Sequence, residues 1–94
     1  MDRTLPNDHR AELEAIRAAI GASQAQMASL MGISTRAYEE LASGRTTARL
    51  LHVLAARYAA LEFAANSDRG DILPWWIAET VEKGAVSVAN KKPA

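Results

Sequence analysis

The sequence predicts an all-α protein, folded as a compact bundle of five helices. Alanine supplies 20 of the 94 residues, whereas only three prolines and five glycines are present to interrupt helices. Large apolar residues recur at helical spacing along most of the chain, and short clusters of turn-forming residues separate these segments. The length and an apolar content of 49% fit a single compact unit with a small core.

Composition also excludes several classes of protein. The absence of cysteine excludes disulfide scaffolds, zinc sites built on thiolates and thiol catalysis. No apolar run approaches the roughly 18–20 residues that span a bilayer, and residues 1–7 lack the apolar stretch of a signal peptide. We therefore expect a cytoplasmic protein without a membrane segment.

The first predicted helix follows Pro6, begins at a cap supplied by Asn7 or Asp8, and ends at Gly21. A spacing of i, i+3 and i+7 places three residues on its inward face: Leu13, Ile16 and Ile20. The second helix begins at a capping box formed by Ser23 and Gln26. It ends after about two turns, at Gly32.

A third short helix is predicted between a cap at Ser34 and a terminating glycine at Gly44. The buried residues expected from the second and third helices are Met27, Leu30, Met31, Tyr38 and Leu41. Thr46 or Thr47 is expected to cap a longer fourth helix, which runs to the turn cluster at 66–71. Its predicted inward stripe consists of Leu50, Leu51, Leu54, Tyr58, Leu61 and Ala65.

Pro74 just inside its start and Gly84 just past its end bracket a fifth helix. The apolar residues on one side of that helix are Leu73, Trp76, Ile77 and Val81. Val86 and Val88 then alternate in a way compatible with a short paired strand, and the polar tail 90–93 is expected to fray.

The most specific signal is the pair of short helices that meet at Gly32. A helix-turn-helix needs a short first helix, a tight turn, and a second helix whose N-terminal end can enter the major groove. Ala28 is small where the two helices approach each other, and Gly32 permits the positive φ of a tight turn. Ile33, Tyr38 and Leu41 are expected to fill the wedge between the helices.

Residues 23–44 resemble the helix-turn-helix of the phage-repressor (Cro/C1-type, XRE-like) family, and the resemblance extends over about residues 10–65. It implies a helical bundle that binds double-stranded operator DNA, usually as a symmetric dimer. By this resemblance, the residues that face base edges would be Thr35, Arg36 and Glu40. Such side chains suit the thymine methyl, guanine O6/N7 and cytosine N4 respectively. The implied contacts to DNA phosphates are Ser23, Gln24, Ser34, Arg45 and Thr47.

The sequence departs from the family pattern at two places. Family members often have glutamate at the position of Ala42, paired with an arginine on the first helix; Arg17 matches that arginine and so lacks this partner. The second departure is Glu39–Glu40, which places two anions on the predicted reading helix. This acidity lowers the expected non-specific affinity for DNA, and it is equally compatible with a surface that binds a protein.

The charge distribution favours DNA binding in only one part of the chain. The chain has 11 basic and 11 acidic residues, but residues 17–58 contain five arginines against two glutamates. This local excess suits a surface that faces phosphates, although an ordinary solvated face explains it equally well. Within that segment we expect Arg49 and Arg57, on the fourth helix, to face solvent.

Trp75 and Trp76 lie outside the family motif. Adjacent helical positions point about 100° apart, so one of the two rings is expected to cover a partner or the fourth helix. Aromatic anchors are enriched at protein interfaces. The predicted dimer interface is therefore Leu73, Trp75, Trp76, Ile77 and Val81. This divides the chain into a helix-turn-helix domain, 1–66, and a dimerisation element with its tail, 67–94.

Together these features predict a sequence-specific DNA-binding regulator, a homodimeric repressor that reads an inverted-repeat operator through the major groove. The alternative is a protein-binding module on the same frame, such as an antitoxin or antiactivator. An enzyme is not expected, because His9 and His52 lie on different predicted helices with no carboxylate or thiol arranged around them. No glycine-rich phosphate loop or metal-ligand cluster is present, so we predict neither a cofactor nor a metal.

Overall fold

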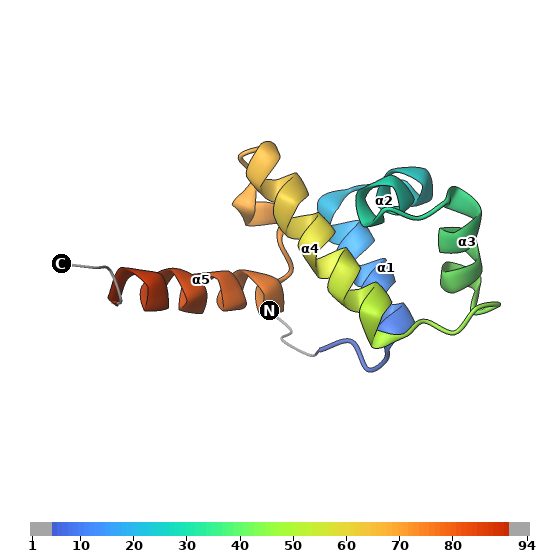
Figure 1. Cartoon of the computed structure of the whole chain (residues 1–94), viewed down its shortest axis with the longest axis horizontal. Helices are drawn as coiled ribbons and strands as arrows, with labels where there is room; N and C mark the ends of the chain where they lie inside the picture. Colours follow the sequence, from blue (N-terminus) through green and yellow to red (C-terminus); the bar gives the residue numbers. More distant parts are fainter. Residues whose placement is uncertain (1–4, 91–94) are drawn as a thin grey trace.

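A computed structural model describes residues 5–90, with side chains as far as residue 85, and it confirms the all-α fold. Over this range the chain forms five α-helices and one short 3-10 helix, and no strand (Figure 1). In chain order the elements are α1 (His9–Ile20), α2 (Gln24–Met31), α3 (Thr35–Ser43), α4 (Leu50–Asn66), η1 (Gly70–Ile72) and α5 (Trp75–Asn90). None of the helices described is long and apolar enough to cross a membrane.

The predicted caps of the first three helices are confirmed. The Asp8 carboxylate accepts from the backbone N–H of Ala11 (2.6 Å). Ser23 and Gln26 form both hydrogen bonds of a capping box. The Ser34 hydroxyl accepts from Ala37 N–H (3.0 Å). The terminating glycines have positive φ angles of 70°, 76° and 83°, and they are Gly21, Gly32 and Gly44 respectively.

Two predicted boundaries are wrong. Neither Thr46 nor Thr47 caps α4, because Thr46 N–H donates to the Glu40 carbonyl (3.0 Å) and so belongs to the loop that closes α3. The N-cap of α4 is Arg49, whose backbone N–H donates to the His52 ring (2.9 Å).

α5 does not end at Gly84 but continues to Asn90, so the strand expected at Val86 and Val88 is helix instead. One helical glycine costs only about 0.5–1 kcal/mol, which by itself is too little to stop a helix. The tail expected to fray after Asn90 lies outside the described residues.

The core lies between α4 and the first three helices. α4 packs against α1 and α2, and α3 packs against α2 and, less extensively, α1. The largest fully buried side chains are Tyr38, Leu13, Ile16, Met27 and Val53. Each of the first four helices therefore supplies at least one large residue to one common core.

The predicted inward stripe of α4 is largely wrong, because the helix is turned the other way. Its buried face is small and consists of Val53, Ala56, Ala59, Ala60 and Ala64. Leu50, Leu51, Leu54, Tyr58 and Ala65 face outward, and only Leu61 of the predicted stripe packs against the core. Four alanines allow the α4 backbone to approach α1 and α2 closely, which the larger leucines would prevent.

α5 projects away from the body formed by the first four helices (Figure 1), and the molecule measures 51 × 27 × 22 Å. Among the α5 side chains that the structure describes, the buried and half-buried ones lie at the start of the helix, and Ile77 is 4% exposed. The Trp76 ring packs against the core and meets the edge of Trp75, with ring centroids 6.0 Å apart. The base of α5 is thus held firmly, whereas Val81 and the residues as far as Ala85 are exposed.

Candidate nucleic-acid interface

The candidate site is built on α2, α3 and the tight connection between them. After α2, Gly32 N–H donates to the Ser29 carbonyl (3.1 Å) and Ile33 N–H to the Ala28 carbonyl (3.0 Å). A Cβ on Gly32 would meet no atom within 4 Å, so the left-handed backbone, not lack of space, requires glycine here. Ser34 follows at once as the cap of α3, which makes the connection as short as the sequence predicts.

α3 has one buried face and one open face. Tyr38 is 0% and Leu41 2% exposed, whereas Thr35, Arg36 and Glu39 are exposed. The Tyr38 hydroxyl donates to a Glu14 carboxylate oxygen on α1 (3.2 Å), and this bond fixes α3 against α1. Burial, with the neighbouring Glu14 charge, raises the pKa of Tyr38 to about 12.

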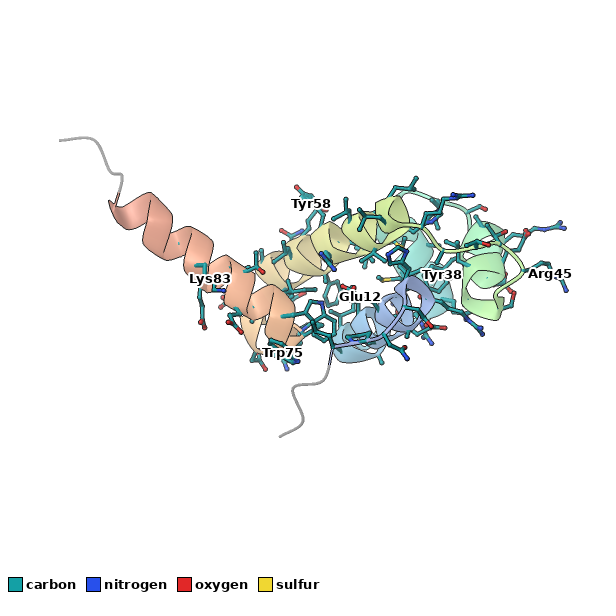
Figure 2. All side chains as sticks on the ribbon, turned by 90° about the horizontal axis from the view of Figure 1, so that it is seen from below. Glu12, Tyr38, Arg45, Tyr58, Trp75 and Lys83 are labelled. Atoms are coloured by element: carbon teal, nitrogen blue, oxygen red, sulfur yellow. The ribbon has the colours of Figure 1, made fainter. Side chains whose placement is uncertain are left out.

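The three residues predicted to face bases lie on or beside this open face. The Arg36 side chain is 88% exposed, and its Nε lies 3.4 Å from a Glu40 carboxylate oxygen one turn further on. Glu40 is half-buried and also accepts from the Thr46 hydroxyl (3.5 Å). Figure 2 shows Arg45 at the end of the molecule where α3 lies. An open hollow of about 360 Å³ there is lined by Arg36, Glu39, Glu40, Ser43 and Arg45.

The predicted phosphate contacts fall into two groups. Ser23 and Ser34 serve as N-caps, so each hydroxyl oxygen accepts from a backbone N–H while its own O–H stays free to donate. Gln24 is the first residue of α2 and is half-buried. Arg45 and Thr47 are exposed in the loop after α3. Thr47 lines a separate hollow of about 320 Å³, which also includes His9 and Arg10 of α1.

The basic excess of residues 17–58 is smaller at the surface than in the sequence, because α1 neutralises two of its arginines. Arg17 Nε donates to Glu14 (2.7 Å), so Arg17 finds a partner on its own helix in place of the one missing at Ala42. The Glu14 hydrogen bond raises the pKa of Arg17. Arg57, which the sequence predicts to face solvent, is only partly exposed because it forms a bidentate pair with Glu12. The exposed arginines left in this segment are Arg36, Arg45 and Arg49.

The Glu12 cluster is the main polar feature that sequence reasoning missed. Glu12 is 8% exposed and accepts from Arg57 Nε (2.6 Å), from Arg57 Nη2 (2.9 Å) and from Trp76 Nε1 (2.9 Å). Burial alone would raise the pKa of Glu12, but the hydrogen bonds from Arg57 and Trp76 lower it below its usual value. One carboxylate therefore joins α1, α4 and α5. The sequence did offer one signal for the burial of Glu12: its helical spacing from Ile16 and Ile20, which places it on the same face of α1 as these core residues.

Packing within the chain takes up several residues of the predicted dimer interface. Ile77 is buried, and Leu73 and Trp76 pack against the core. Trp75 is half-buried and Val81 is 43% exposed. The inward position of Trp76 agrees with the expectation that the two adjacent rings cannot face the same core equally.

Each histidine ring contacts a backbone group. His9 Nδ1 lies 3.3 Å from the Ala48 carbonyl oxygen, and His52 accepts from the backbone of Arg49. Within residues 5–90, no group of His, Cys, Asp or Glu side chains is placed to hold a metal ion. Comparison of the chain with protein-family models, with curated proteins and with solved structures finds no match.

Proposed function

We propose that this protein is a sequence-specific DNA-binding transcriptional regulator that acts in the cytoplasm as a homodimeric repressor. It reads an inverted-repeat operator by placing the N-terminal half of α3 in the major groove. The observation that carries the proposal is the exposure of Thr35 and Arg36 at the start of a short helix whose opposite face is anchored by Tyr38. The resemblance of residues 23–44 to the phage-repressor helix-turn-helix supports the same conclusion.

Arg36 is the residue best suited to read a base. A nearly fully exposed guanidinium can form two hydrogen bonds with guanine O6 and N7. Its contact with Glu40 is long, at 3.4 Å, and lies at the surface, where ion pairs contribute little. Arg36 therefore exchanges Glu40 for a base at small cost. Glu40 is then able to accept from a neighbouring cytosine N4.

The remaining predicted contacts position the protein on the DNA backbone. The Ser23 and Ser34 hydroxyls donate to phosphates beside the exposed N–H groups at the starts of α2 and α3. Gln24 acts at the same end of α2, and Arg45 and Thr47 hold the flanking phosphates from the loop after α3. These contacts set register and orientation, and they carry no sequence information of their own.

The test is the affinity of Arg36→Ala for a selected operator and for unrelated DNA, measured by fluorescence anisotropy. We expect specific affinity to fall by about 5- to 150-fold for each half-site, the loss of one good base contact per subunit, with an unchanged circular dichroism spectrum. Lys83→Ala is the matched control, because Lys83 is also an exposed cation paired with a glutamate one turn away. Unchanged specific affinity in Arg36→Ala, or an equal loss in Lys83→Ala, would refute this assignment.

The second candidate function is a protein-binding module, such as an antitoxin or antiactivator. The observation in its favour is that Glu39 and Glu40 offset Arg36 and Arg45 around α3, so this surface has little net charge. The salt dependence of affinity separates the two functions. Contact with several phosphates makes affinity fall steeply with salt on a log–log plot, whereas a protein contact through a surface of little net charge responds weakly.

A further inference from the structure

Arg10, in the first turn of α1, is bonded to the far end of α3. Its Nε donates to the Ala42 carbonyl (2.5 Å), one of the last four carbonyls of α3, which have no partner in the regular pattern of helical hydrogen bonds. A guanidinium is also attracted to the negative end of the helix dipole. The same group lies beside the terminating glycine, because a Cβ on Gly44 would be 3.2 Å from Arg10 Nη1. Arg10 thus holds the chain where it leaves α3.

The preceding residue of α1 lies against the other end of the loop that follows α3. His9 Nδ1 is 3.3 Å from the Ala48 carbonyl oxygen, just before α4 begins. Side chains of α1 therefore contact the backbone before and after Arg45 and Thr47, the two exposed residues of the proposed phosphate contacts. The open hollow of about 320 Å³ lies between these two attachments. The loop is thus tied to α1 at both ends, and Arg45 projects from this end of the molecule (Figure 2).

We propose that Arg10 is a positioning residue for DNA binding, whose bond to Ala42 orders the loop so that Arg45 meets a flanking phosphate. Arg10 itself does not contact the DNA. A long, exposed side chain such as Arg45 loses conformational freedom when it binds, and a loop that is already ordered reduces this loss. The inference rests on the proposed function, because it concerns one of the contacts that this function requires.

The base-reading end of α3 is held by a different bond. The Tyr38 hydroxyl donates to Glu14 on α1 at a partly buried position, whereas the bond from Arg10 lies at the surface. Arg36 lies closer along the helix to Tyr38 than to Ala42. Removing the Arg10 side chain should therefore weaken the contact with the backbone phosphates and leave the base preference of Arg36 unchanged.

The first test is a double-substitution cycle on the affinity of the full chain for a selected operator. Arg45→Ala should weaken binding by about 3- to 10-fold and reduce the slope of log affinity against log salt by about one per subunit, as expected for a lost phosphate contact. Arg10→Ala should weaken binding by at least about twofold, and the double variant should match Arg45→Ala to within about twofold. Additive losses would show that Arg10 contacts phosphate itself, and would overturn the proposal.

Arg69→Ala is the matched control in this cycle. It removes an exposed arginine that is also held by a partner, Asp71, but lies beside η1. The affinity of this variant should equal that of the wild type. An equal loss in Arg69→Ala and Arg10→Ala would reduce the effect to net charge and contradict a positioning role.

The second test needs no DNA. Backbone order parameters from NMR relaxation should fall over residues 44–48 of Arg10→Ala, from about 0.85, typical of rigid backbone, towards about 0.6, typical of flexible backbone, while α4 keeps wild-type values. A wild type that binds its operator, with a loop that stays ordered in Arg10→Ala, would refute the role of Arg10 alone. Wild-type protein that binds no operator would refute the proposed function and this role in DNA binding together.

Discussion

Replacing Glu12 by glutamine should destabilise the fold by about 2–3 kcal/mol. Glutamine keeps the shape but loses the charge that accepts two hydrogen bonds from Arg57 and one from Trp76. Breaking a fully buried ion pair costs about 3–5 kcal/mol. The Arg57 side chain is 40% exposed and recovers part of its hydration, which reduces this figure.

The measurement is urea denaturation at neutral pH, followed by circular dichroism and by tryptophan fluorescence. In a separate thermal denaturation, a loss of this size should lower the midpoint temperature by roughly 10–20 °C in a domain of this length. Asp71→Asn is the matched control, because Arg69 pairs with Asp71 in the same bidentate geometry (2.9 and 3.0 Å) but at an exposed position. Its effect should be much smaller than that of Glu12→Gln, because an exposed ion pair contributes little to stability. Equal effects of the two substitutions would refute the reasoning.

The stability that the Glu12 carboxylate contributes should depend on pH in one direction. The folded state lowers the pKa of Glu12 from its ordinary 4.5, so the native protein prefers the carboxylate form. The resulting stability is fully present above pH 4.5 and is lost as pH falls through the lowered pKa. The stability difference between wild type and Glu12→Gln should therefore narrow in acid. A difference that stays constant down to the acid transition would contradict the assignment.

Two further predictions concern the candidate site. Tyr38→Phe should cost about 1 kcal/mol through loss of the bond to Glu14. Folding raises the pKa of Tyr38 from 10.0 to about 12, so the wild type should lose this contribution to stability as pH rises through that range, whereas Tyr38→Phe has no hydroxyl to lose. Urea denaturation at neutral and alkaline pH measures whether the unfolding free energies of the two proteins converge. Gly32→Ala should destabilise by about 1–2 kcal/mol, since alanine must adopt a φ of 76°. Gly84→Ala, in a helix and in open space, should instead stabilise by about 0.5–1 kcal/mol; thermal midpoints that shift in the same direction would contradict this account.

The parts of the fold that sequence predicts correctly depend on local chemistry. Asp8, Ser23 and Ser34 cap helices through hydrogen bonds to residues only three positions away. Gly32 ends α2 through its own φ. These features place Thr35 and Arg36 at the exposed start of α3, because nothing distant in the chain is needed to put them there.

The errors arise where the answer depends on distant segments. α4 is apolar on both sides, so periodicity alone could not tell whether its leucines or its alanines face the core. The alanines face the core because α1 and α2 approach the α4 backbone closely. The partners of Glu12 lie 45 and 64 residues away in the sequence. The contact between Glu40 and Thr46 similarly depends on the path of the loop after α3.

The most direct test of the central proposal is selection of bound sites from a random pool of double-stranded DNA, with the full chain at about physiological salt. The proposed function predicts enrichment of an inverted repeat, with half-sites about one helical turn apart. It also predicts that Arg36→Ala loses preference at one position of each half-site while the other positions are retained. Folded wild-type protein that enriches no sequence would contradict DNA reading by α3 and favour the protein-binding alternative.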